Sequence, residues 1–158
     1  MPPPLLFSLD GLDVGRVELT RGQIYDLLPH RHEFMLLGGV CMMDRANKRL
    51  VAFADVGMDD WWVRGHIPQR TLLPGALILE MAGQASAIAA RKLADLDGFM
   101  GFGGVDDCKF RETVVPPARL FLLCQGEEYR PRRIVSSTQG VMDGRIVFEA
   151  KIIGVPIR

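Results

Sequence analysis

Two side chains near the middle of the chain have the types that acid–base chemistry requires. His66 lies in a loop of sequence Gly65-His66-Ile67-Pro68, and Glu80 lies in the apolar segment that follows. An imidazole ionises near neutral pH and suits a general base. A carboxyl group among apolar residues favours its neutral form, because burial disfavours charge, and a neutral carboxyl suits a general acid. His66 and Glu80 are therefore the candidate catalytic pair.

Three further residues could position a substrate beside this pair. Pro74 and Gly75 open the apolar segment, and the first N–H groups of a helix lack partners and carry partial positive charge. Such groups, here at Gly75 and Ala76, can hold a carbonyl oxygen as it gains negative charge. Gln84 follows Glu80 by one helical turn on the same face, so its amide can orient the carboxyl group.

A long helix must carry Glu80. The residues from Pro74-Gly75 to about Leu93 are apolar nearly all round, so we expect this helix to be enclosed on most sides. A shorter helix is predicted from the capping box Thr20-Arg21-Gly22-Gln23 to about Leu27.

The rest of the chain has the pattern of strands joined by hairpins. We predict strands over residues 34–43, 50–56, 98–110, 119–129, 134–142 and 145–155. Asp143-Gly144 is the sequence of a two-residue type I′ turn between the last two. The prediction is an α+β fold with an antiparallel sheet wrapped around one long central helix. Residues 1–18 form a loosely structured N-terminal leader, and residues 19–158 form a single domain.

Composition excludes several functions. The chain has 158 residues, enough for one core, and 19 basic and 19 acidic side chains give no net charge, which argues against nucleic-acid binding. The three cysteines form no metal-binding or disulfide pattern, so we expect free thiols and neither metal nor cofactor. The most apolar stretch contains Glu80, which would cost roughly 2.5 kcal/mol or more inside a bilayer. With no signal peptide visible, we expect a cytoplasmic protein without membrane contact.

Taken singly, each candidate has a plainer explanation. A loop histidine more often makes a structural hydrogen bond, and a lone glutamate in a helix is more often a partly solvated edge residue. Gln84 alone would be a satisfied polar group. The order and spacing of these residues together are the distinguishing feature.

That order resembles the β-hydroxyacyl-(acyl-carrier-protein) dehydratases of fatty-acid synthesis, over about residues 20 to 155. The similar segments are Leu28-Pro29-His30-Arg31 with Phe34 and Leu36, Gly65-His66-x-Pro68, Leu73-Pro74-Gly75, Glu80, Gln84, Lys109-Phe110-Arg111 and Val114-Val115-Pro116. The resemblance implies a hot-dog fold and a homodimer with joined sheets and shared active sites. His66 of one chain would then work with Glu80 of the other, and relatives often assemble as trimers of dimers.

The resemblance also implies a reaction. His66 would remove the α-proton of a (3R)-3-hydroxyacyl thioester while the Gly75 N–H steadies the carbonyl oxygen. Protonated Glu80 would deliver a proton to the departing hydroxyl, releasing water and a trans-2-enoyl thioester. Relatives act on substrates attached to acyl carrier protein, an acidic partner that requires a basic surface. The candidates for that contact here are Arg70, Arg91, Lys92 and Arg111.

The sequence also departs from the family and leaves alternatives open. His32 and Glu33 stand where relatives have an aromatic residue and a proline, and Trp61-Trp62 replace a common phenylalanine pair. A hot-dog acyl thioesterase and a non-catalytic acyl-binding protein are the alternative functions. Acyl chain length, carrier protein against coenzyme A, the pathway, isomerase activity and the role of the leader are not determined by the sequence.

Overall fold

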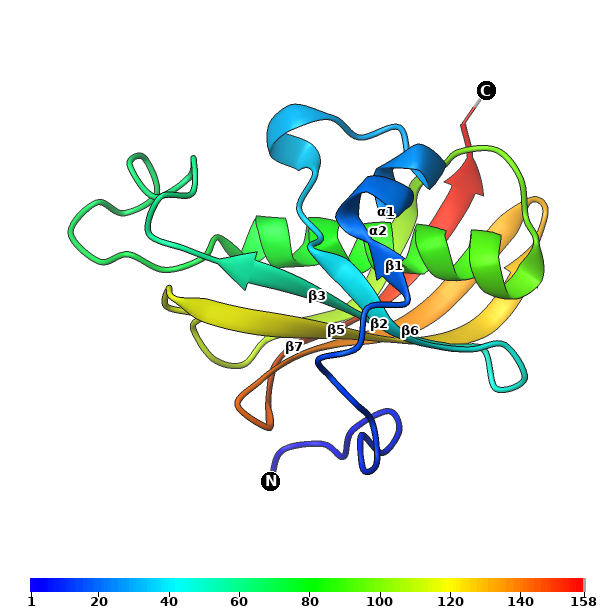
Figure 1. The fold of residues 1–158 in the computed structure, drawn as a ribbon, viewed down its shortest axis with the longest axis horizontal. Coiled ribbons are helices and arrows are strands. Elements are labelled where there is room, and N and C mark those ends of the chain that lie inside the picture. The colour runs from blue at the N-terminus through cyan, green and yellow to red at the C-terminus, as the bar shows by residue number, and fades with distance from the viewer. Residues whose placement is uncertain (158) are drawn as a thin grey trace.

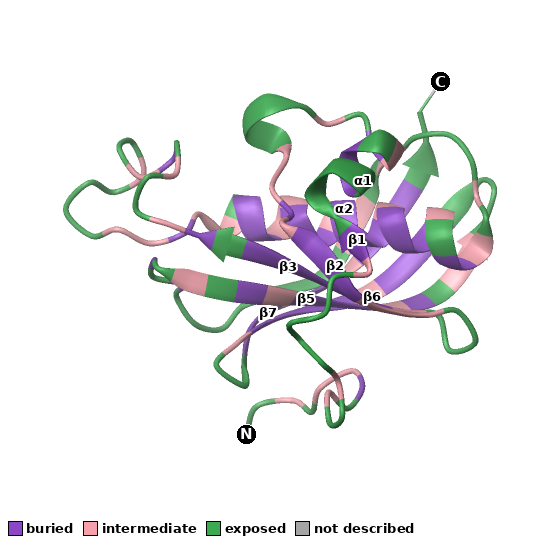
Figure 2. Ribbon diagram, viewed as in Figure 1, coloured by how far each residue is buried: buried purple, intermediate pink, exposed green. Residues whose placement is uncertain are grey.

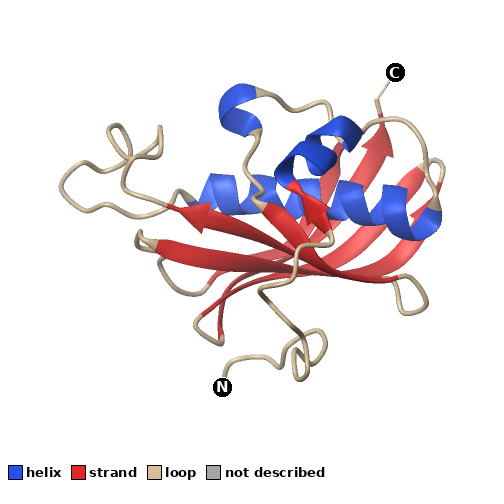
Figure 3. Cartoon of the chain, in the orientation of Figure 1, coloured by secondary structure: helices blue, strands red, loops and turns tan. Residues whose placement is uncertain are grey.

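The computed structural model describes residues 1–157, which form one antiparallel sheet and two α-helices (Figures 1 and 3). The helices are α1 (Arg21–Leu27) and α2 (Gly75–Ala94), and a 3-10 turn covers His32–Phe34. The strands are β1 (Leu19–Thr20), β2 (Gly39–Asp44), β3 (Arg49–Val56), β4 (Met100–Phe110), β5 (Ala118–Arg130), β6 (Arg133–Met142) and β7 (Arg145–Pro156). They lie side by side in the order β1-β2-β3-β5-β6-β7-β4.

Helix α2 lies along one face of the sheet and forms the centre of the main core (Figures 1 and 2). It begins directly after Pro74, whose ring is compatible with a helix entrance, and ends at Ala94, followed by Asp95 in a left-handed conformation. Its small and apolar residues are buried on several sides, against β3, β5, β6 and β7. The predicted antiparallel sheet around one central helix is therefore confirmed.

Local signals in the sequence gave most element boundaries. Thr20 and Gln23 form the predicted capping box, and Asp143 and Gly144 both have positive φ, as a type I′ turn requires. The predicted strand over residues 34–43 is wrong in its first half. Phe34 ends the 3-10 turn and its carbonyl accepts a hydrogen bond from a side chain of α2, so strand pairing begins only at Gly39. No helix within residues 1–157 is long and apolar enough to cross a membrane.

The leader over residues 1–18 contains no helix or strand, yet it packs against the sheet face opposite α2 (Figure 1). Phe7 is 6% exposed and belongs to a second apolar cluster with Val51, Phe53 and Leu123. The Gln139 side chain makes two hydrogen bonds to the leader: it accepts from the Leu6 N–H at 2.8 Å and donates to the Pro4 carbonyl at 3.0 Å. The leader thus covers apolar surface that the sheet would otherwise expose.

Truncating Phe7 should reveal how much the leader contributes to stability. We expect Phe7→Ala to lower the free energy of unfolding by about 3 kcal/mol, the lower end for a buried phenylalanine. Val14→Ala, in the same leader but 42% exposed, is the matched control and should change it little. Chemical denaturation of both variants measures this, and equal stability of the two would contradict the packing role.

Candidate functional site

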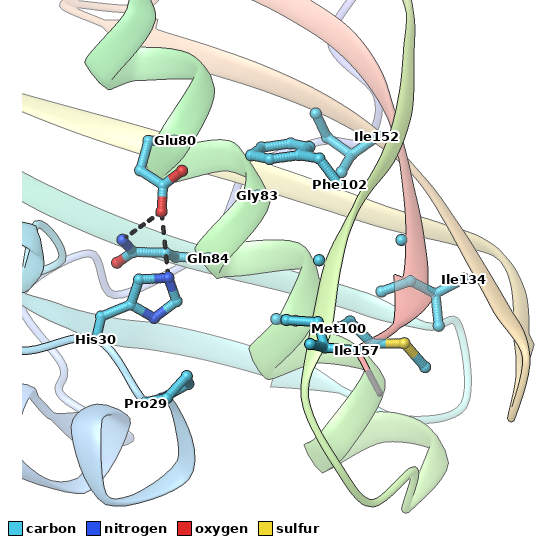
Figure 4. A pocket seen from close by; sticks show the side chains of 13 residues that line it. Pro29, His30, Glu80, Gly83, Gln84, Met100, Phe102, Ile134, Ile152 and Ile157 are labelled. Carbon is cyan, nitrogen blue, oxygen red and sulfur yellow. Dashed lines mark hydrogen bonds and ion pairs between the residues drawn. The ribbon is translucent and has the colours of Figure 1, made fainter.

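Glu80 and Gln84 lie on one face of α2, as the spacing predicted. Gln84 is 1% exposed, and its Nε2 donates to Glu80 Oε1 at 3.0 Å (Figure 4). The same Nε2 donates to the Phe34 carbonyl at 2.9 Å. The Glu80 side chain keeps 21% of its surface accessible. One carboxyl oxygen is therefore held by the protein, while the group as a whole still reaches solvent.

Tyr25 of α1 fixes the direction of the Gln84 amide. Burial raises the pKa of Tyr25 to about 12, so its hydroxyl stays protonated. That hydroxyl accepts from the Leu37 N–H at 2.8 Å and donates to Gln84 Oε1 at 2.7 Å. With Oε1 of Gln84 occupied in this way, its NH₂ group must face Glu80.

Removing the tyrosine hydroxyl should loosen this chain of hydrogen bonds. We expect Tyr25→Phe to lower the free energy of unfolding by about 1–3 kcal/mol, because it leaves buried groups of Leu37 and Gln84 without a partner. Thermal or chemical unfolding measures the change. Unaltered stability would mean that the two groups find other partners.

His30 approaches Glu80 from the segment that follows α1. Its Nε2 lies 3.2 Å from Glu80 Oε1, the same oxygen that Gln84 contacts (Figure 4). The segment is held in place by Arg31, whose guanidinium donates to the carbonyls of Tyr25 and Leu28 at 2.9 Å. The Glu80 carboxyl is thus approached by side chains from two separate elements.

A pocket of about 170 Å³ opens beside these polar groups. His30, Glu80 and Gln84 line one side of it, and the rest of its wall is mostly apolar, with Phe102, Met100, Ile134, Ile152 and Ile157 (Figure 4). Gly83 makes room for Phe102, since a Cβ there would lie 2.5 Å from the phenyl ring. The pocket thus combines a mostly apolar wall with a carboxyl group, which suits an acyl chain whose reactive end carries the polar atoms.

His66 is held by its loop in a defined tautomer. Its backbone N–H bonds to the Trp62 carbonyl at 2.9 Å, and its ring Nδ1 lies 3.0 Å from the Leu72 carbonyl oxygen. A carbonyl only accepts, so Nδ1 carries the proton and Nε2 offers a lone pair. The next residue, Ile67, has φ of 48°, an unfavourable conformation for a β-branched side chain, as is common at functional sites.

The first turn of α2 provides two free N–H groups. Pro74 O accepts from Leu77 and Ile78, and no hydrogen bond from the Gly75 or Ala76 N–H occurs within residues 1–157. A Cβ at Gly75 would lie 2.8 Å from the Phe110 ring, so glycine allows this aromatic ring to cover the helix entrance. These N–H groups can serve as donors to an oxygen that gains negative charge.

The four basic residues expected to contact a carrier protein lie at two different places. Arg70 and Arg111 are exposed near the start of α2, but Arg91 and Lys92 lie in its last turn, which is about 24 Å away along the helix axis. Arg111 is paired with Glu149, and Arg91 donates to the Gly98 carbonyl at 2.8 Å. Within one chain these four residues therefore form two separate basic positions, and their contact with a carrier protein stays a prediction.

Within one chain the structure brings together only part of the predicted site. Glu80 and Gln84 line the pocket, but His66 is not among the residues that line it. Sequence reasoning missed Tyr25 and His30 as neighbours of the acid, although His30 belongs to the Leu28-Pro29-His30-Arg31 motif. No cluster of three or more potential metal-binding side chains occurs in the described part of the chain.

The family model and the curated relatives that match this chain agree on one family. The model of a FabA-like domain matches residues 28–151. The 3-hydroxyacyl-(acyl-carrier-protein) dehydratase FabZ of Oceanobacillus iheyensis is 33% identical, over 82% of this chain and 93% of the relative. The enzyme of the same name from Bacillus cytotoxicus is 35% identical, over 82% of this chain and 90% of the relative.

Solved structures share the fold. The dehydratase heterocomplex ApeI:P from Xenorhabdus doucetiae matches with a TM-score of 0.70 at 16% identity, over 85% of this chain and 91% of that chain. A hypothetical thioesterase with coenzyme A from Streptococcus pneumoniae matches with a TM-score of 0.58 at 12% identity, over 82% and 88%. At such identities the likeness shows the fold alone, and the predicted hot-dog fold is confirmed.

Proposed function

This chain belongs to the family of FabA-like domains, and from that membership we propose that it dehydrates 3-hydroxyacyl thioesters to trans-2-enoyl thioesters in acyl-chain biosynthesis. The observation that carries the proposal is the Glu80 carboxyl, held by Gln84 at one wall of a largely apolar pocket. An acid at that point can protonate a hydroxyl group on an acyl chain bound in the pocket.

The roles of the other groups follow from their hydrogen-bonding states. His66 Nε2 takes the α-proton, because Nδ1 already donates to the Leu72 carbonyl. The electron pair of the broken C–H bond forms the new double bond, and the N–H groups of Gly75 and Ala76 stabilise the thioester oxygen as it gains enolate character. The C–O bond breaks as Glu80 protonates the hydroxyl, and the products are water and the enoyl thioester.

We propose further that each active site is shared by two copies of the chain, with His66 of one acting opposite Glu80 of the other. The absence of His66 from the lining of the Glu80 pocket of one chain supports this. So does strand β4, which lies at an edge of the sheet and exposes the large side chains of Phe102 and Phe110. An exposed edge with apolar side chains favours pairing with another chain.

The substrate carrier is proposed to be acyl carrier protein, as the names of the curated relatives state for those enzymes. Exposed Arg70, near the start of α2, has no ion-pair partner within residues 1–157, whereas Arg111 is paired with Glu149. It is well placed to attract an acidic carrier, since it lies in the same loop as His66.

The direct test is to incubate the purified protein with a 3-hydroxyacyl thioester on carrier protein and to measure enoyl absorbance and free thiol. We expect enoyl product without thiol release. Release of thiol without enoyl product would identify a thioesterase, and neither product from a ladder of chain lengths would favour a non-catalytic acyl-binding protein.

A further inference from the structure

The two nitrogens of the His30 ring have very different surroundings. Nε2 lies 3.2 Å from Glu80 Oε1, whereas Nδ1 is buried and has no hydrogen-bond partner within residues 1–157. The side chain as a whole keeps 26% of its surface accessible. His30 is not needed for the proton transfers assigned above, yet it contacts the group that serves as the acid.

These surroundings favour one tautomer of His30. A proton on Nδ1 would be a buried donor without an acceptor, which costs about 1–3 kcal/mol. A proton on Nε2 instead sits on the nitrogen that lies 3.2 Å from Glu80 Oε1, and the bare Nδ1 lone pair is the less costly group to leave unpaired. The surroundings thus favour the His30 tautomer whose N–H is on the side of Glu80, whereas Nε2 of His66 offers a lone pair.

Glu80 Oε1 accepts a hydrogen bond from Nε2 of Gln84 at 3.0 Å and has Nε2 of His30 at 3.2 Å. An oxygen that faces two N–H groups has no room for a proton of its own. Oε2 is therefore the better position for the acidic proton of Glu80, because this oxygen has no hydrogen-bond partner within residues 1–157. When that proton leaves, the charge on the new carboxylate is stabilised by the same two donors.

We propose that His30 is a positioning residue for the acid step: with Gln84 it confines the Glu80 proton to Oε2 and stabilises the carboxylate formed as the hydroxyl departs. This rests on the proposed function. Because the contact gains strength as Glu80 loses its proton, it acts on the transition state more than on substrate binding. Its loss should lower kcat and leave KM nearly unchanged.

Two substitutions separate the N–H from the bulk of the ring. His30→Leu fills a similar space without a donor, and His30→Gln can bring an amide N–H close to the position of the ring Nε2. We expect His30→Leu to lower kcat by about tenfold, the equivalent of one hydrogen bond to an acidic group, with KM within about twofold of the wild type. His30→Gln should retain most of the activity.

A second substrate distinguishes a role in the acid step from a general structural role. A 3-chloroacyl thioester loses chloride, which needs no proton from Glu80, while the α-proton still goes to His66. The His30→Leu variant should therefore process this analogue at nearly the wild-type rate, after subtraction of the enzyme-free rate. Thermal unfolding should show that all variants are folded.

The proposal would be overturned if His30→Leu kept the wild-type kcat, if it slowed both substrates equally, or if it failed to fold. It would also be overturned if His30→Gln were as slow as His30→Leu. If the wild-type protein itself gave no enoyl product from any 3-hydroxyacyl thioester, the proposed function would fail instead, and the two failures are distinguishable.

Discussion

Replacing His66 with alanine is expected to lower kcat/KM for dehydration by about 10²–10⁴-fold, the usual contribution of a general base. The ring accepts the α-proton on Nε2 while Nδ1 donates to the Leu72 carbonyl, and alanine can do neither. Because the side chain is only half-buried, we expect the variant to fold. The rate of enoyl formation under steady-state conditions measures the effect.

His32→Ala is the matched control for this experiment. His32 is an exposed histidine in the 3-10 turn, with no assigned role in the chemistry, so its loss should leave the rate within about twofold. Equal activity of His66→Ala and the wild type would remove His66 from the mechanism. A large loss in His32→Ala would show that the wrong histidine had been chosen.

Replacing Glu80 with glutamine is expected to have an effect of similar size, a loss of about 10²–10⁴-fold in kcat. Glutamine keeps the length of the side chain, and its carbonyl oxygen can still accept from Gln84 Nε2. It lacks an acidic proton to give to the leaving hydroxyl. The expected result is a folded protein that binds substrate and releases almost no water.

Glu33→Gln removes a carboxyl group from the exposed turn next to the site and serves as the control. It should leave kcat unchanged. The assignment of Glu80 as the acid would be wrong if Glu80→Gln retained more than about a tenth of the wild-type rate. Loss of a general acid normally costs about 10²–10⁴-fold.

The parts of the site that depend on neighbours in the sequence were predictable. Glu80 and Gln84 are one turn apart on a helix whose apolar pattern is plain, and the structure has them hydrogen-bonded. The contacts of Tyr25 and His30 with this pair join residues far apart in the chain. Nothing in the local pattern of α1 or of the following segment indicates which residue of α2 it will meet.

Two other features needed three-dimensional information. The leader has the prolines and glycines of a loose segment, yet Phe7 and several leucines of the leader pack on the sheet. Apolar residues without a regular period do not predict such packing. Arg70 and Lys92 were both predicted to contact a carrier protein, but they lie at opposite ends of α2. Folded, that helix separates them.

The most direct test of a site shared by two chains is to mix the two inactive variants, His66→Ala and Glu80→Gln, under conditions in which subunits exchange. Random pairing makes half of the dimers mixed, and each mixed dimer has one intact site out of two, so about a quarter of wild-type activity should return. No recovery after verified exchange would contradict the shared site and place His66 and Glu80 of the same chain together.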